Sequence, residues 1–451
     1  MDTKKLRQKI LDLAIRGKLV PQDPNDEPAS VLLERIRAEK EQLIKEGKIK
    51  RTKKSNASDT SHYENVPYKI PCNWCWTTLG EIGTWQAGAT PSRAQKDYYG
   101  GNIPWLKTGD LTDGYIYEIP ETITNKALEE TSVKLNPTGS VLIAMYGATI
   151  GKIGILTFPA TTNQACCACV DYKAVTQKYL FYFLLSHKEE FIRLGGGGAQ
   201  PNISKEKIVE TFIPIPPIAE QGRLVNEIEK LFSLVGRLDS NTDKLRRYIA
   251  LEKENILHLA ITGKLLPQEP ADEPAITLLK KINPNYIPCD NRHYENVPPG
   301  WAVCTLEDIL DYEQPQKYIV SSTEYSDAYK IPVLTAGKSF IIGKTNENFG
   351  ICERLPVIIF DDFTTDSKYV DFPFKVKSSA MKILRVKGNI NPRYISYLMS
   401  ITRLVGETHK RYWISEYRKI KIMLPPIEEQ NRIVTVIEKI YNGLDNILAE
   451  L

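Results

Sequence analysis

Apolar residues recur at alternating steps of four and three positions along three separate segments of the chain. In the middle segment the pattern runs from Leu224 to Leu259, and only Thr242 and Glu252 interrupt it with polar side chains. This spacing predicts a helix with a coiled-coil seam, and a helix from 220 to 259 would be about 60 Å long. The apolar seam positions are Leu224, Ile228, Leu231, Val235, Leu238, Leu245, Ile249, Ile256 and Leu259.

The chain also repeats itself, and the repeated blocks come in the same order in both copies. Ile10–Ala29 returns as Ile256–Ala275, and the sequence HYENVP occurs unchanged in each copy. The segments between the repeated blocks, about 80–200 and 307–412, hardly match each other. We call the repeated blocks the frame and the two unlike segments between them the fillings. Such a repeat predicts that the frame has the same role in both copies and that the two fillings have different roles.

The two remaining heptad segments fit this repeat as two pieces of one helix. When the copies are aligned, the C-terminal piece corresponds to Leu224 through Thr242 and the N-terminal piece to Glu252 through Leu259. We therefore expect the ends of the chain to meet in space, so that the molecule is circularly closed and pseudo-two-fold. The alternative is a set of unrelated amphipathic helices that pack on separate cores. The seam positions are Ile433, Ile437, Ile440, Leu444 and Ile447 in the C-terminal piece, and Leu6, Ile10 and Leu13 in the N-terminal piece.

The two fillings contain both strand and helix patterns. Ser140–Gly147 followed by Lys152–Leu156 predicts a buried hairpin, and Gln177–Leu194 predicts a long helix. In the second filling, Asn391 as N-cap and Pro392 at the first helical position predict a counterpart helix, and LPVIIF and YVDFPFKV predict strands. We therefore expect an α/β fold of the mixed α+β kind, with two globular domains joined by two long antiparallel coiled-coil helices.

The domain boundaries follow from these patterns. The stretch 39–61 is rich in lysine and arginine, and its simplest interpretation is a solvated linker, although an arm that contacts phosphates stays open. The expected divisions are an N-terminal helix fragment (1–38), the basic linker (39–61), a first variable domain (62–217), a central helix and turn (218–275), a second variable domain (276–426) and a C-terminal helix (427–451).

Composition and charge narrow the class of protein without identifying it. The net charge of +4 permits local basic patches and does not by itself predict binding to nucleic acid. The first residues do not have the pattern of a signal peptide, and we find no run of about 18 apolar residues, so we expect no membrane partner. The eight cysteines have no spacing typical of a disulfide framework, which favours a cytoplasmic protein.

Sequence patterns of known catalytic and cofactor sites are mostly missing. GATIGK, at 147–152, has one residue too few between its glycines for a phosphate loop and lacks the Ser or Thr that would coordinate magnesium. None of the three Pro-Pro pairs follows the Asp or Asn that amino-methyltransferases place at the reaction site. We therefore assign no catalytic residue, no metal ligand and no bound cofactor to this chain.

Two weaker interpretations of polar clusters stay open. A zinc site could use Cys72 with Cys75, or the cysteines at 166–169, but the second copy of the repeat keeps neither group, which favours buried small apolar side chains. A nuclease site could use carboxylates beside a lysine, although their spacing is short for strands that must converge on one metal. These residues are Asp361, Asp362, Asp366 and Lys368.

Several segments resemble the specificity subunit of type I restriction–modification systems. The resemblance rests on PPIAEQGRLVNEIEK and PPIEEQNRIVTVIEK, each at the start of a long helix, and on LAIRGKLVPQDP and LAITGKLLPQEP. TPSR followed by GGNIPWLKTGDL, together with GGGGAQPNIS and DDFTTDSKYVDFPF, resembles parts of that family's target-recognition domains. The resemblance covers nearly the whole chain, but the second variable domain lacks TPSR.

The resemblance implies a DNA-recognition subunit without an active site of its own. Each variable domain would be a target-recognition domain that reads one half of a bipartite, gapped DNA sequence, and the helices would act as a spacer that sets the gap. The partners would be double-stranded DNA, two methyltransferase (modification) subunits docked on the helices, and restriction and translocation subunits outside them. The methyl donor, ATP and magnesium would be bound by those partners.

Within this interpretation we expect the DNA contacts in loops of the two variable domains. Phosphate contacts by lysine and arginine would set the register, and side chains in the major groove would choose the bases. For each single residue the alternative is an exposed side chain that does not contact DNA. The candidates are Thr90, Arg93, Lys107, Tyr146, Lys152, Gln200 and Asn202 in the first domain, and Lys338, Thr365, Lys368, Arg411 and Tyr412 in the second.

Two other classes of function stay open from the sequence. One is a DNA nuclease or methyltransferase whose site lies in one variable domain. The other is a coiled-coil adaptor that does not contact DNA.

Overall fold

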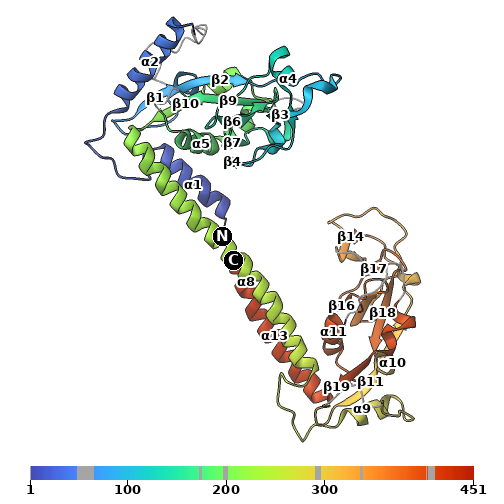
Figure 1. Ribbon diagram of the computed structural model, residues 1–451. Helices are drawn as coiled ribbons and strands as arrows, with labels where there is room; N and C mark the ends of the chain where they lie inside the picture. Colours follow the sequence, from blue (N-terminus) through green and yellow to red (C-terminus); the bar gives the residue numbers. More distant parts are fainter. Residues whose placement is uncertain are drawn as a thin grey trace. The chain divides into compact units, whose positions relative to one another are not determined.

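The computed structural model describes residues 2–47, 66–171, 175–196, 202–289, 296–335, 339–402, 404 and 412–451 (Figure 1). They form two compact units, Met1–Ser240 and Asn241–Leu451. One helix, α8 (Ile218–Ile261), begins in the first unit and ends in the second. Its 44 unbroken residues confirm the long helix expected at 220–259, and they extend over about 66 Å.

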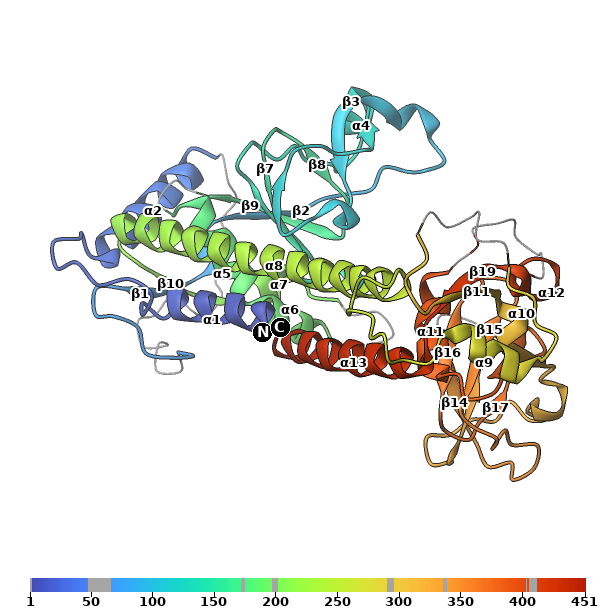
Figure 2. The ribbon, with the colours of Figure 1, turned by 90° about the horizontal axis from the view of Figure 1, so that it is seen from below.

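In the first unit, α1 (Thr3–Ile15) lies antiparallel along the first part of α8 (Figure 1, Figure 2). Arg7 forms an ion pair with Asp239 (N–O 3.0 Å), whereas Gln22, which follows α1, donates to Glu220 near the start of α8. Apolar seam residues pack between α1 and α8, as the heptad pattern predicts. The buried ones are Ile10, Leu224, Ile228 and Val235.

In the second unit, α13 (Ile427–Glu450) lies antiparallel along the last part of α8 (Figure 1, Figure 2). Lys253 forms an ion pair with Asp445 (N–O 2.6 Å), and the Tyr441 hydroxyl donates to the Lys253 carbonyl oxygen at 2.8 Å. The buried seam residues in this unit are Ile249, Ile256, Ile433 and Ile437.

The seam prediction is wrong at four positions. Leu238 and Leu245 lie toward the middle of α8, and both side chains are exposed. Leu259 is exposed because the end of α8 turns Leu257 and Ala260 inward instead, toward the globular part of the second unit. Near the end of α13, Ile447 is exposed as well.

The globular part of the first unit is built on two sheets. A five-stranded sheet has the order β2-β9-β6-β7-β4, a three-stranded sheet has the order β5-β3-β8, and β1 pairs with β10. The strands are β1 (Cys75–Thr78), β2 (Gly83–Ala87), β3 (Tyr99–Leu106), β4 (Gly114–Ile116), β5 (Thr122–Ile123), β6 (Val141–Ala144), β7 (Ile153–Leu156), β8 (Thr161–Thr162), β9 (Cys166–Asp171) and β10 (Phe212–Ile215). The further helices are α2 (Ala29–Lys45), α3 (Leu79–Ile82), α4 (Asn125–Glu130), α5 (Gln177–Ser186), α6 (Lys188–Gly195) and α7 (Lys205–Val209).

The second unit has the same plan. Its sheets have the orders β12-β18-β15-β16 and β14-β13-β17, and β11 pairs with β19. The strands are β11 (Ala302–Thr305), β12 (Leu310–Glu313), β13 (Ile331–Leu334), β14 (Ile341–Thr345), β15 (Val357–Asp361), β16 (Ser367–Val370), β17 (Lys375–Val376), β18 (Met381–Val386) and β19 (Lys421–Leu424). The further helices are α9 (Ala275–Ile282), α10 (Leu306–Ile309), α11 (Pro392–Ile401) and α12 (Tyr412–Ser415).

The two variable domains therefore share a topology although their sequences hardly match. In each, the larger sheet has one order with antiparallel neighbours, and β4 is an extra strand in the first. In each, the central strand of the smaller sheet pairs antiparallel with one neighbour and parallel with the other. Sequences that are not identical can share a fold class when their apolar residues follow the strand period.

Most expected elements are present, and two are interrupted. The β6–β7 hairpin is confirmed, and so is the helix start at Asn391, whose side chain accepts from the backbone N–H groups of Arg393 (2.9 Å) and Tyr394 (3.2 Å). The segment YVDFPFKV (369–376) is not one strand: β16 ends at its second residue, Val370, and β17 forms its last two residues. Pro373 stands between them and cannot donate a backbone hydrogen bond to a sheet.

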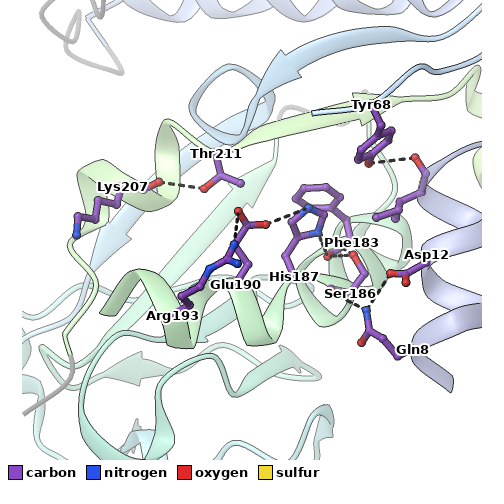
Figure 3. A network of polar contacts seen from close by, with 11 residues as sticks. Gln8, Asp12, Tyr68, Phe183, Ser186, His187, Glu190, Arg193, Lys207 and Thr211 are labelled. Carbon is purple, nitrogen blue, oxygen red and sulfur yellow. Dashed lines mark hydrogen bonds and ion pairs between the residues drawn. The ribbon is translucent and has the colours of Figure 1, made fainter. Parts of the chain in front are cut away.

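The helix expected over Gln177–Leu194 is two helices, α5 and α6, that meet at His187 (Figure 3). The Ser186 hydroxyl donates to the Phe183 carbonyl oxygen at 2.6 Å and lies 2.8 Å from His187 Nδ1. Gln8 of α1 donates to the Ser186 carbonyl oxygen at 2.9 Å. These side chains bond to backbone groups that a continuous helix would use for itself, which explains the break.

Candidate nucleic-acid interface

In the first unit, one end of the larger sheet collects the loops in which the candidate residues lie. β2 and β6 run toward this end and β9 and β7 begin there, as the pairs Ala87↔Cys167 and Ala144↔Cys166 show. We call it the loop end. The loops that leave it span 88–98 and 145–152, and they follow β2, which is partly buried, and β6, which is fully buried.

The segment that contains Thr90 and Arg93 is fixed by its own backbone. A Cβ atom on Gly88 would lie 2.1 Å from the Thr162 carbonyl oxygen, so only glycine permits this close approach. The Ala89 carbonyl oxygen accepts from Trp105 Nε1 at 3.0 Å. The Thr90 hydroxyl bonds to Gln164, and both Thr90 and Arg93 remain exposed on this fixed segment.

Arg93 and Lys107 converge on one carboxylate. Glu121 accepts from Arg93 Nη2 at 2.9 Å and from Lys107 Nζ at 2.5 Å. The hydrogen bond from Lys107, followed by the one from Arg93, lowers the pKa of Glu121. The structure thus brings together two predicted cations that are 14 positions apart, and it adds a carboxylate that the sequence patterns did not single out.

Tyr146, Lys152 and Asn202 form the other part of the loop end. Tyr146 and Asn202 are partners in an isolated β-bridge, and Ile203 N–H donates to the Met145 carbonyl oxygen at 2.9 Å. Tyr146 and Asn202 are exposed and Lys152 is half-buried. Gln200, the remaining candidate of this domain, lies outside the described residues.

The second unit has an equivalent loop end, where β12 and β15 stop and β18 and β16 begin. Lys368 is exposed there, with its Nζ 4.8 Å from the centroid of the Phe340 ring. Lys338 and Arg411 lie outside the described residues.

Thr365 and Tyr412 are buried, so the prediction that they contact DNA directly is wrong. The Thr365 hydroxyl accepts from Leu404 N–H at 3.3 Å, and Tyr412 N–H donates to the Asp362 carbonyl oxygen at 2.9 Å. Both residues therefore hold the loops of the second loop end in place through hydrogen bonds to backbone groups. Their residue types suggested exposed polar groups, and a single Thr or Tyr in a sequence carries no signal that distinguishes the two cases.

The acidic residues considered for a nuclease site are already bonded within the protein. Asp361 accepts from Phe363 N–H at 2.9 Å and from the Thr364 hydroxyl at 2.7 Å. Asp362 forms a buried ion pair with Lys382 (N–O 3.2 Å). Among the described residues, no group of three or more His, Cys, Asp or Glu side chains is arranged to hold a metal ion. In the same part of the chain, no helix is long and apolar enough to cross a membrane.

The repeated PPxxEQ motif joins each variable domain to its long helix. In the first unit, Glu220 accepts from Trp74 Nε1 at 2.9 Å, and Gln221 accepts from the backbone N–H of Thr176, the N-cap of α5, at 2.9 Å. Arg223 pairs with Asp26 at 2.5 Å. Burial raises the pKa of Glu220.

The second unit repeats these contacts one by one. Glu429 accepts from Trp301 Nε1 at 2.8 Å, and Gln430 accepts from the N–H of Asn391, the N-cap of α11, at 2.9 Å. The counterpart of the third contact is an ion pair of 2.5 Å between Arg432 and Asp272. Burial raises the pKa of Glu429 as well. The sequence marked the motif, and the repeated Trp74 and Trp301 were the available signal for its partner.

Comparison with known proteins agrees with this duplicated arrangement. A family model described as the type I restriction modification DNA specificity domain matches residues 71–240 and 298–451. The chain is 44% identical over 150 residues to the type I restriction enzyme EcoR124I/EcoR124II specificity subunit of Escherichia coli, a match that covers 32% of this chain and 37% of that subunit. It is 25% identical to the EcoEI specificity subunit of Escherichia coli over 99% of this chain and 90% of that subunit.

A solved structure shares the fold. It comes from work titled as the structural basis of complex assembly and conformational transition of the type I R-M system, and the match has a TM-score of 0.56 at 16% identity. The match covers 85% of this chain and 94% of that chain.

Proposed function

Because the chain belongs to the family of type I restriction–modification DNA specificity proteins, we propose that its two variable domains each read one half of a bipartite, gapped DNA site. The observation that carries this proposal is one topology with two unlike loop ends. The sheets and the PPxxEQ contacts are equivalent in the two units, whereas the exposed loop residues differ. Equivalent supports with different reading surfaces suit two different half-sites.

We further propose that the long helices are the spacer between the half-sites. Fourteen positions of α8 separate Asp239, which pairs with Arg7, from Lys253, which pairs with Asp445. That stretch is about 21 Å long, and the six residues before Arg7 and the six after Asp445 would together cover about 18 Å as helix. These lengths support α1 and α13 as two pieces of one helix antiparallel to α8, in a closed pseudo-two-fold coiled coil.

The chemistry would be supplied by partner subunits. In the proposed assembly the chain binds double-stranded DNA, two methyltransferase subunits dock on the helices, and restriction subunits join outside them, all in the cytoplasm. The methyl donor, ATP and magnesium belong to those partners. The support from this chain is that the candidate acidic residues are occupied by protein donors.

Sequencing of methylated DNA tests the proposal. Seven residues, about two helical turns, are inserted into α8 after Ser240, and α13 is extended by seven residues, so that the phase of the apolar face is kept. The inserted length is about 10 Å, or about three base pairs at 3.4 Å each. We expect methylated sites with a longer gap and unchanged half-sites, and an altered half-site sequence with the original gap would disprove the spacer.

A further inference from the structure

Glu121 stands between two cations at the first loop end. Arg93 Nη2 lies 2.9 Å from Oε2 of this carboxylate, and Lys107 Nζ lies 2.5 Å from Oε1, so each oxygen serves one cation. The Arg93 and Lys107 side chains are 57% and 42% exposed, and that of Glu121 is 33% exposed. All three groups are therefore open to a ligand from solvent.

Arg93 is also held by aromatic rings. Its guanidinium carbon lies 4.4 Å from the centroid of Tyr99 and 5.2 Å from that of Trp105. The Tyr99 hydroxyl in turn donates to the Pro91 carbonyl oxygen at 2.6 Å. Stacking on aromatic faces keeps a guanidinium in place without a carboxylate partner, so the position of Arg93 does not depend on Glu121 alone.

We propose that Glu121 occupies the place of a DNA phosphate in the free protein, and that Arg93 and Lys107 exchange its carboxylate for one phosphate of the bound duplex. A phosphodiester has one negative charge and two non-bridging oxygens, so it matches the carboxylate in charge and in number of acceptors. The exchange costs little, because exposed ion pairs contribute little in water. This inference rests on the proposed function.

Glu121 then acts as a positioning residue that weakens the binding of every duplex by a similar factor. Glu121 keeps the two cations together in the free protein, and the one phosphate that binds them must displace its carboxylate. Since phosphate contacts carry no base information, its removal changes affinity and leaves base preference unchanged. A residue that reads bases, or one that only supports the fold, would behave differently.

The test uses the chain assembled with its methyltransferase subunits. We would measure binding of two labelled duplexes over a range of salt concentrations. One duplex contains the sequence that the assembly methylates, and the other has one half-site changed. Glu121→Gln is expected to bind both duplexes about threefold more tightly, with an unchanged ratio between them. Arg93→Gln and Lys107→Gln are each expected to weaken both, and each to reduce the salt slope by about one.

Asp97→Asn is the matched control. It removes an exposed carboxylate that pairs with Lys126 at 2.5 Å, and it changes the net charge by the same amount. We expect it to change binding less than Glu121→Gln does, and we expect the gain of Glu121→Gln to disappear when Arg93 and Lys107 are also replaced by Gln. Thermal unfolding of each variant accompanies the binding data and is expected to stay at the wild-type midpoint.

Three results would overturn the inference: Glu121→Gln binds as the wild type does, Asp97→Asn gives an equal gain, or Glu121→Gln alters the ratio between the duplexes. Failure of the proposed function looks different. In that case the wild-type assembly binds the two duplexes equally, whatever residue stands at 121.

Discussion

The two loop ends share one backbone hydrogen bond but differ in the buried side chains that surround it. The Met145 carbonyl oxygen accepts from Ile203 N–H at 2.9 Å, and the Asp362 carbonyl oxygen accepts from Tyr412 N–H at 2.9 Å. Met145 follows β6 and Asp362 follows β15, which occupy the same place in the two sheets. The fold therefore sets the backbone contact in each unit and leaves the side chain at this position free to vary.

Beneath this contact the first unit is apolar and the second is charged. In the first unit Met145 and Cys167 are buried in an apolar cluster. In the second, Asp362 pairs with Lys382, which occupies the place of Cys167. Lys382 also donates to Gln314 at 3.0 Å, and Asp362 accepts from the N–H of Trp413 at 2.8 Å. A buried charge persists only with such a full set of partners, so the second loop end is the more demanding to build.

Breaking the charged pair should give the largest effect. Asp362→Met leaves Lys382 buried without its partner, and we expect a loss of about 3–5 kcal/mol in the free energy of unfolding. Urea unfolding measures this loss. The double variant Asp362→Met with Lys382→Cys recreates the apolar pair of the first unit and is expected to recover most of the stability. No recovery would mean that the charge is required for reasons other than its pairing.

The tryptophan contacts of the PPxxEQ motif should respond equally in the two units. Trp301→Phe removes the hydrogen bond to the buried Glu429, and we expect a cost of about 1–3 kcal/mol in the unfolding of the second unit. Trp74→Phe is the matched variant in the first unit. Unfolding is followed by a probe in each unit, and the losses in free energy of unfolding are compared. Clearly unequal losses would show that the two equivalent hydrogen bonds contribute differently to stability.

The same contacts predict a dependence of stability on pH. Burial raises the pKa of Glu220 and Glu429 above the ordinary value of 4.5, so the folded state holds these protons more tightly than the unfolded state does. The contribution of these two carboxyls to stability should therefore be fully present below pH 4.5 and be lost as pH rises through their folded pKa values. Glu220→Gln and Glu429→Gln should each flatten the profile of urea midpoint against pH, and the double variant should flatten it further. A profile unchanged by both substitutions would contradict this assignment.

The exposed ion pairs along α8 should give the smallest effect. Asp445→Asn removes the partner of Lys253 in the second unit, and we expect the thermal midpoint to fall by less than about 2 °C, because solvent screens such pairs. The effect should shrink further at high salt. Asp239→Asn is the corresponding variant in the first unit. A large loss from either would indicate that the helices depend on charge more than on their apolar contact.

The repeat and the heptad spacing predicted the long helix and both helix pairings, because burial of a regular apolar face is visible in the order of residues. The seam failed at Leu259 because the end of α8 turns Leu257 and Ala260 toward the globular part instead, and a heptad pattern alone does not show such a change of the buried face. The common topology of the variable domains could not be predicted, because strand pairing depends on contacts between distant segments.

Single site residues were harder to predict than the loops that contain them. Arg93 and Lys107 do lie together, yet their shared partner Glu121 has no motif that would reveal it. Thr365 was expected at the surface and is buried, because its hydroxyl bonds to the backbone of Leu404, 39 positions away. Such a partner is visible only after the chain has folded.

The chain enters each variable domain along one strand and leaves it along the strand that pairs with the first. Cys75↔Ile215 begins the β1–β10 pair in the first unit, and Ala302↔Leu424 begins the β11–β19 pair in the second. A replacement domain would have to match these backbone positions, the cap that meets the PPxxEQ glutamine, and the side-chain contacts of its helix with the long helices, such as Lys178–Glu229 and Arg393–Glu438. Genetic exchange of whole domains between related chains that keep these contacts could therefore create new combinations of half-sites in one step.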